Sequence, residues 1–489
     1  MWNRVRTLNQ EIVLVIFCVG IFLYGIGLGN IKPEGFKGFY VQTLFHIGGA
    51  LFVFLNYKTL HFRELKALVL PLGCFVVVIV LGILTMFDTI LPQTPSKILK
   101  EINTHLLSYM ILFLLVCLYA MSAPRRNVIV LCCVFVVMCA AVALASLYIS
   151  GVSLLESGRL RVFVVPFFFF HVVADSIWLF GLSAVGIAGV FVCQRLFARL
   201  VFALIAILGL LAILVNGERA ILLAFVAMVF GAMCIWHYRY KLAILCGIAL
   251  LCIPLGFGVY HYTKTLPERH NFAHMLDNFW AVWQTPPIQM GKYDKLCFNG
   301  RFECAEQSTQ NGKAEFSWEH SSLARLALYK SALHLIAKEP FTPHLPTMNR
   351  NGMYLSAYYG KDDPYRFYVT QKIGTEFLSE QYHFYGYYHI HSVVLSLLLS
   401  FGVIGFVAVC AFQAFLFYQG FRSLSVLQTQ AHTPSNTWVR ILIFAFMLVF
   451  VGIGVHLCFD VAHPIILQPL FILYGLFVGL CLNVSKEVR

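Results

Sequence analysis

The sequence predicts an all-α integral membrane protein with about twelve transmembrane helices and one large loop domain outside the membrane. Of its 489 residues, 60% are hydrophobic and only 12% are charged, whereas a soluble protein carries roughly 25% charged residues. Apolar runs of about 17–25 residues, long enough to cross a bilayer, recur along the chain. The short loops between them carry lysine and arginine in alternation, which is typical of a multi-pass protein.

The expected spans follow the apolar runs in order. They lie near residues 11–29, 39–56, 67–86, 103–122, 127–150, 168–192, 197–215, 220–236, 241–260, 391–417, 439–457 and 464–483. The first run is long and lacks a small-residue cleavage site, so we interpret it as a retained anchor rather than a signal peptide. Basic residues in the loops place both termini, with Arg4 and Lys486, in the cytoplasm.

Three parts of the chain follow from these spans. Residues 1–260 carry spans one to nine, residues 261–390 form a loop domain opposite the cytoplasm, and residues 391–489 carry spans ten to twelve. The loop domain contains turn signals such as Pro286-Pro287 and Asn299-Gly300. Within it, helical spacing predicts one amphipathic helix that ends before Pro340 and presents the apolar positions Leu323, Leu326, Tyr329, Leu333 and Ile336.

Composition also excludes several kinds of site. The net charge of +13 is spread over short loops, which favours orientation and attraction to anionic lipid rather than nucleic-acid binding. The absence of a CxxC or HExxH motif leaves a metal site without support. Most of the 15 cysteines lie in apolar runs, whereas Cys297 and Cys304 lie in a polar segment. These two are candidates for a local disulfide if that segment faces an oxidising compartment.

Arg219 is the first candidate for chemistry. It ends the short turn Asn216-Gly217-Glu218-Arg219 between two expected spans, on the side opposite the cytoplasm. One interpretation is an interfacial anchor paired with Glu218. The other is a guanidinium that binds phosphate oxygens at two points. Because an arginine on this side does not serve the positive-inside rule, its position favours the second interpretation.

His391 is the second candidate, because it opens the tenth span directly after the loop domain. The positive partial charge of a helix N-terminus disfavours the imidazolium form. A neutral imidazole at this place can accept a proton near neutral pH. The alternative is an interfacial histidine like its neighbours His383 and His389.

Other polar residues are weaker candidates. Arg325 lies on the expected loop helix, where it either faces solvent or provides a second cation for phosphate. Arg159 and Arg161, ahead of the sixth span, are candidates of the same kind. His171 and Asp175 are four residues apart, so they share a helix face. That pair fits either a polar cavity or bonding between helices.

The order of these motifs resembles the O-antigen ligase and polymerase superfamily, the bacterial membrane glycosyltransferases of type C. The resemblance covers approximately residues 150–420. Its parts are the segment Arg159-Leu-Arg161 to Pro166, the turn Asn-Gly-Glu-Arg219-Ala, the loop helix from Arg325 through Ala332 to Pro340, and His391-Ser392 ahead of Gly402-Val-Ile-Gly405. There are two departures. Ser392 replaces the commoner asparagine, and Pro340-Phe-Thr-Pro-His344 replaces a glycine-rich turn.

The resemblance implies an O-antigen ligase in the bacterial inner membrane with its active site on the periplasmic face. The donor would be a glycan on undecaprenyl diphosphate and the acceptor a sugar hydroxyl of lipid A–core. The transfer would be inverting and independent of metal or any other cofactor. His391 would be the general base, and Arg219 and Arg325 would bind the diphosphate. Supporting roles would fall to Arg159, Arg161, His389 and Ser392.

Three alternatives remain at this point. Within the superfamily, the protein would be a polymerase that extends the glycan, or a protein O-oligosaccharyltransferase. Outside it, the protein would be a polysaccharide transporter without chemistry. A transporter predicts charged residues along the middle of the membrane. Here the charge concentrates at one face instead, with His171 and Asp175 as the exception.

Overall fold

The structure is a computed structural model that falls into two compact units interleaved in sequence. The first unit comprises residues 1–77, 103–237 and 408–489, and the second comprises residues 78–102 and 238–407. The structure describes residues 2–28, 41–56, 65–90, 93–159, 161–169, 173–236, 320–360, 367–373, 376–382, 389–430, 433–461 and 464–486, together with isolated positions between 250 and 283. Each unit is described by itself.

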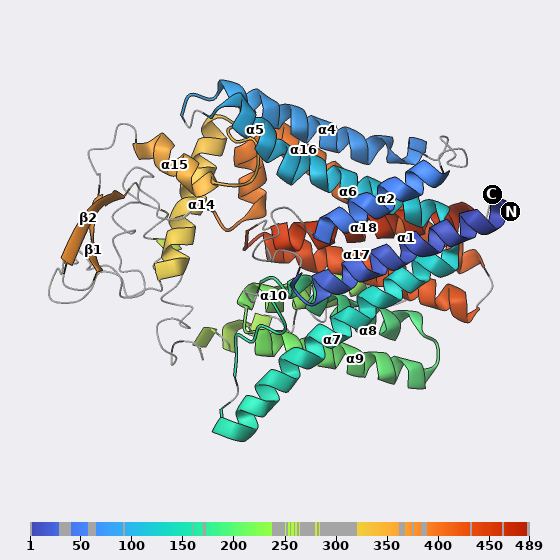
Figure 1. The fold of residues 1–489 in the computed structure, drawn as a ribbon. Helices are drawn as coiled ribbons and strands as arrows, with labels where there is room; N and C mark the ends of the chain where they lie inside the picture. Colours follow the sequence, from blue (N-terminus) through green and yellow to red (C-terminus); the bar gives the residue numbers. More distant parts are fainter. Residues whose placement is uncertain are drawn as a thin grey trace. The chain divides into compact units, whose positions relative to one another are not determined.

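The first unit is a bundle of apolar helices (Figure 1). It contains α1 (Trp2–Gly25), α2 (Val41–Asn56), α6 (Ser108–Ser122), α7 (Arg125–Ser157), α8 (Ser176–Val192), α9 (Leu196–Asn216), α10 (Arg219–Ile235), α17 (Pro434–Leu457) and α18 (Pro464–Lys486). It also holds the beginning of α4 (Val69–Leu84) and the C-terminal part of α16 (Val393–Thr429), while the one-turn π-helix Asn103–Leu107 precedes α6.

Local signals decide where these helices begin and end. Gly158 and Gly217 follow α7 and α9 in the left-handed conformation, with φ of 66° and 77°. Glycine adopts this conformation without the strain that a Cβ would cause, and it therefore ends helices. At the start of α17, Thr433 accepts a hydrogen bond from the backbone N–H of Asn436 at 3.2 Å, and Pro434 follows it. A hydroxyl cap followed by proline is a favoured helix start.

Close helix packing in the first unit rests on small residues. A Cβ added at Gly475 of α18 would lie 2.6 Å from the carbonyl oxygen of Phe113 on α6, and one at Gly479 would lie 2.4 Å from Ala120 Cβ. Lipid offers little hydrophobic drive for helix association, so membrane helices rely on such close approach.

Seven helices among the described residues are long and apolar enough to cross a membrane. They are Lys66–Phe87, Pro95–Ser122, Arg125–Ser157, Leu196–Asn216, Val393–Thr429, Pro434–Leu457 and Ile466–Lys486. Four shorter apolar helices, Asn9–Gly25, Val41–Asn56, Ser176–Val192 and Arg219–Ile235, coincide with further expected spans. The ninth expected span, 241–260, falls largely outside the described residues. A helical multi-pass architecture is confirmed, whereas the count of twelve and the side of each loop stay predictions.

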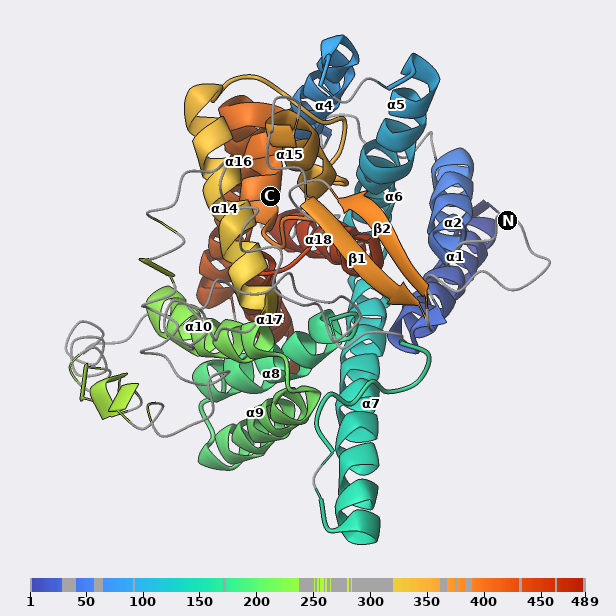
Figure 2. The same ribbon diagram turned by 90° about the vertical axis from the view of Figure 1, so that its left-hand side faces the viewer.

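The second unit contains the end of α4, the 3-10 turn η4 (Thr85–Phe87), α5 (Pro95–Ile102), α14 (His320–Lys338), α15 (Asn351–Gly360) and the N-terminal part of α16. Figure 2 shows α14 and α15 beside α16. An antiparallel hairpin of β1 (Phe367–Ile373) and β2 (Glu376–Tyr382) adds strands to the all-α expectation. The expected loop helix is confirmed as α14. Leu326, Tyr329 and Ile336 of its apolar face pack against the core, whereas Leu333 is 40% exposed and the side chain of Leu323 lies outside the described residues.

One hydrophobic core joins α14, α15 and the start of α16 in the second unit. Leu328, Ala332 and Leu335 of α14 pack with Tyr354 and Leu355 of α15 and with Ile390, Leu395 and Leu399 at the start of α16. Most of these side chains are fully buried. Burial of a leucine or isoleucine contributes about 1.5–3 kcal/mol, so this core fixes α14 against the segment that carries His391.

Candidate functional site

The first glycine of the Gly402-Val-Ile-Gly405 motif breaks α16. Gly402 has φ 65° and ψ −174°, a conformation that only glycine adopts readily. The break frees the backbone N–H of Val403, which donates to the carbonyl oxygen of Pro340 at 2.8 Å. A Cβ on Gly402 would lie 3.0 Å from the backbone of Phe341. The motif is therefore a docking point for the loop after α14.

That loop, residues 340–347, is held along its length by the second unit. The backbone N–H groups of His344 and Leu345 both donate to the carbonyl oxygen of Ser400, at 3.1 and 3.3 Å. Ser400 Oγ in turn donates to the carbonyl oxygen of Thr347 at 3.0 Å. The loop also passes Gly82 of α4, where a Cβ would lie 2.8 Å from the carbonyl oxygen of Pro346. These contacts fix a loop that contains no glycine.

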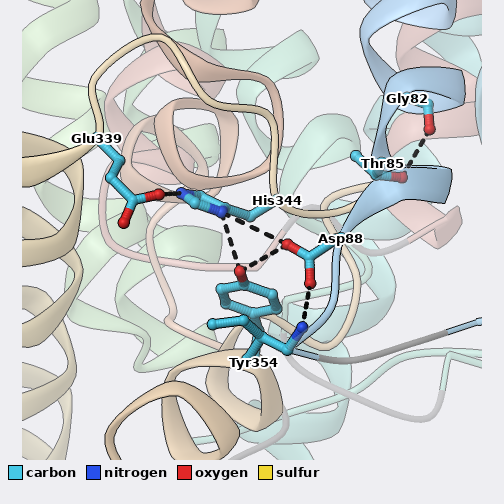
Figure 3. A network of polar contacts seen from close by, with 7 residues as sticks. Gly82, Thr85, Asp88, Glu339, His344 and Tyr354 are labelled. Carbon is cyan, nitrogen blue, oxygen red and sulfur yellow. Dashed lines mark hydrogen bonds and ion pairs between the residues drawn. The ribbon is translucent and has the colours of Figure 1, made fainter.

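A buried polar network fixes the side chain of His344 (Figure 3). Tyr354 Oη donates to Asp88 Oδ2 at 2.7 Å and lies 2.9 Å from His344 Nδ1. The hydroxyl of Tyr354 has one proton, and it goes to Asp88. In the bond between Tyr354 and His344, the donor is therefore the N–H at His344 Nδ1 and the acceptor is Tyr354 Oη. His344 Nε2 lies 3.9 Å from Glu339 Oε2. Burial, followed by the bond to Asp88, raises the pKa of Tyr354, which keeps its hydroxyl protonated.

His391 lies directly before α16, as the sequence predicts, but its backbone conformation was not foreseen. Its φ is 59°, in the left-handed region that a residue other than glycine seldom occupies. Ser392 then begins the helix, because its carbonyl accepts from the N–H of Ser396 at 2.9 Å and its Oγ from that of Leu395 at 3.4 Å. Serine and asparagine are both preferred at this capping position. Ser392 therefore occupies a capping position for which asparagine is equally suited.

Tyr329 and Arg325 bring α14 to this point. Tyr329 Oη donates to the carbonyl oxygen of His391 at 2.6 Å. Arg325 lies four residues earlier, and so on the same face of α14 as Tyr329. Its side chain is partly buried, and its Nε makes no hydrogen bond to any residue that the structure describes. Buried donors are seldom left unsatisfied, so this Nε is suited to an anionic acceptor.

Arg219 is placed by a separate set of contacts in the first unit. It is the exposed first residue of α10, directly after Glu218 at the N-cap position. The backbone N–H of Glu218 donates to Asn216 Oδ1 at 3.2 Å. Asn216 is fully buried, and its Nδ2 donates to Asp175 Oδ1 at 3.0 Å. The turn that carries Arg219 is therefore anchored to a buried carboxylate ahead of α8.

Arg159 and Arg161 lie in the same unit on the segment after α7. Both side chains are exposed. Ser153 Oγ donates to the carbonyl oxygen of Arg159 at 3.2 Å, and Ser150 Oγ to that of Arg161 at 2.8 Å. A Cβ on Gly217 would lie 3.3 Å from the backbone nitrogen of Phe163 in this segment. The contacts bring the segment beside the turn of Arg219, so three exposed arginines belong to one part of the first unit.

The structure thus groups the candidates into two sets. His391, Ser392, Arg325 and the partly buried His389 belong to the second unit, whereas Arg219, Arg159 and Arg161 belong to the first. His171, His383, Cys297 and Cys304 lie outside the described residues, so the proposed disulfide stays a prediction. The contacts made by Tyr329, Asp88 and Tyr354 were missed, because no local sequence signal marks partners so far apart along the chain.

Comparison with known protein families gives a match for part of the chain. Residues 203–410 match the family model described as O-antigen ligase. The matched region begins in α9 and includes Arg219, α14, His391 and the break at Gly402. The comparison with curated proteins finds no match.

Proposed function

We propose that the chain is a member of the O-antigen ligase and polymerase superfamily, whose family model matches residues 203–410, and that it is an O-antigen ligase of the bacterial inner membrane. The donor is a glycan on undecaprenyl diphosphate, and the acceptor is a sugar hydroxyl of lipid A–core. The reaction takes place at the periplasmic face. One observation carries the proposal: a hydrogen bond ties the left-handed His391 to α14, the helix that presents the partly buried Arg325.

His391 is the general base in this proposal. It removes the proton from the acceptor hydroxyl while that oxygen attacks the anomeric carbon of the donor sugar. The bond between this carbon and the diphosphate oxygen breaks, and undecaprenyl diphosphate leaves with the electron pair. A single displacement of this kind inverts the anomeric configuration. Base catalysis contributes about 10²–10⁴-fold to the rate, so loss of the imidazole removes most turnover.

Arg325 and Arg219 bind the diphosphate. The leaving group gains negative charge as the glycosidic bond breaks, and fixed guanidinium groups stabilise that charge without a metal ion. The Nε of Arg325 supports its assignment, because it has no hydrogen-bond partner among the residues that the structure describes. The exposed position of Arg219 at the start of α10 supports its own, because a helix N-terminus also favours anions. Arg159 and Arg161 add positive charge beside the turn of Arg219.

A glycan inventory tests the proposal. A deletion strain carrying the wild-type gene is compared with one carrying His391→Ala, with equal protein in the membrane as the control. We expect polymer to move from lipid A–core to the undecaprenyl carrier in the variant. Lipid A–core that stays decorated at normal length would overturn the choice of base. Single repeats on lipid A–core would indicate a polymerase, and unchanged lipopolysaccharide in the full deletion would indicate protein glycosylation or transport.

A further inference from the structure

The hydroxyl of Tyr329 makes a well-defined contact with the backbone of the proposed base. Its Oη donates to the carbonyl oxygen of His391 at 2.6 Å, a short distance for such a bond. The two residues lie 62 positions apart, so the bond closes a long loop at this point. The aromatic ring of Tyr329 packs against the core that joins α14, α15 and α16. The ring and the hydroxyl therefore serve different purposes.

The conformation of His391 needs such a restraint. Its left-handed backbone costs of order 1–3 kcal/mol for a residue with a Cβ, and it persists only where surrounding contacts fix it. On one side Ile390 is fully buried in the core. On the other side Ser392 starts α16. Between them, the Tyr329 bond holds the peptide that leads out of His391.

We propose that Tyr329 is a positioning residue that holds the left-handed backbone of His391 and so aims its imidazole at the acceptor. This inference rests on the proposed function, since it assigns Tyr329 a role through the proposed base. Because α14 carries both Tyr329 and Arg325, Tyr329 also links the geometry of the base to that of Arg325, which lies one turn earlier on the helix. The hydroxyl touches neither substrate nor reacting atoms. Its loss therefore lowers the rate of the chemical step without weakening donor binding.

The test uses the full-length protein purified in lipid nanodiscs, with an undecaprenyl-diphosphate-linked glycan as donor and lipid A–core as acceptor. Tyr329→Phe keeps the ring and removes only the hydroxyl. We expect kcat to fall about 2- to 12-fold, the range that corresponds to one neutral hydrogen bond. The KM for the donor should change less than twofold. Rates are normalised to the folded fraction, read from a thermal transition of each variant.

The matched control is Tyr358→Phe in the same unit. Tyr358 also packs against the core, and its hydroxyl bonds to the exposed Lys338 at 2.8 Å. We expect wild-type kinetics from it. A second measurement combines Tyr329→Phe with His391→Ala. If Tyr329 acts through the imidazole, the double variant keeps the residual rate of His391→Ala alone.

The outcomes separate this inference from the function on which it rests. Wild-type protein without transfer activity would overturn the proposed function and the inference together. A normal rate for His391→Ala would remove the base and, with it, the role of Tyr329. An inactive His391→Ala beside an unchanged Tyr329→Phe would leave the ligase standing and overturn only the inference. A further loss of rate in the double variant would also overturn it, because Tyr329 would then act independently of His391.

Discussion

The backbone N–H of Val403 donates a hydrogen bond to the carbonyl oxygen of Pro340 at 2.8 Å. This bond joins the loop after α14 to the middle of α16, at the place where Gly402 interrupts the helix. An unbroken helix would use the same N–H for its own ladder. The second unit thus exchanges one bond within a helix for one that fixes a loop.

Gly402→Ala should destabilise the second unit. The added Cβ would occupy a backbone conformation reserved for glycine and would lie 3.0 Å from Phe341. Strain and overpacking together should cost about 2–5 kcal/mol. The thermal transition of the purified protein measures the change. Gly454→Ala is the control, because its Cβ would meet nothing within 4 Å, and it should leave the transition unchanged or slightly higher.

Asp175→Ala should disturb the turn of Arg219. It removes the hydrogen bond from the buried Nδ2 of Asn216 to Asp175 Oδ1, which costs about 1–3 kcal/mol. A double-mutant cycle with Asn216→Ala should give a coupling free energy of about 0.5–3 kcal/mol. Thermal stability and the donor KM are measured for each variant. Additive effects on both quantities would show that this hydrogen bond does not hold the turn.

Tyr354→Phe should loosen the loop 340–347. The substitution removes the donor to Asp88 and the partner of His344 Nδ1 while keeping the ring. Removing these two hydrogen bonds from the network should cost about 1–3 kcal/mol. Hydrogen exchange of the N–H groups of His344 and Leu345 should speed up. Tyr148→Phe, at a side chain that is 73% exposed, serves as the control, and equal exchange in the two variants would refute the network's role.

Arg219→Lys should weaken donor binding although the charge is kept. Lysine is a point charge and cannot bind two phosphate oxygens in the planar geometry of a guanidinium. We expect the donor KM to rise about 10- to 100-fold, in line with the strength of hydrogen bonds to charged groups. Arg195→Lys, at the exposed residue that precedes α9, should leave KM unchanged. A normal KM for Arg219→Lys would reduce Arg219 to an interfacial anchor.

The sequence by itself determined the helices, several of their ends and the order of the motifs. Apolar runs predict eleven of the apolar helices, and helical spacing predicts α14. Capping residues and glycine act on backbone groups within one turn. The effects of Ser392 and Gly217 on helix ends therefore depend only on the sequence next to them. The sequence also predicts the position of His391 ahead of α16, because the start of a helix depends on local residues.

Only the tertiary structure decided how the candidate residues are held. The bond from Asn216 to Asp175 joins residues 41 positions apart, and that from Tyr329 to His391 joins residues 62 apart. No periodicity or capping motif in the sequence predicts either pairing, because each depends on which helix faces pack together. The left-handed backbone of His391 likewise needs the core around Ile390. Local chemistry selects the residues, and packing between distant segments sets their geometry.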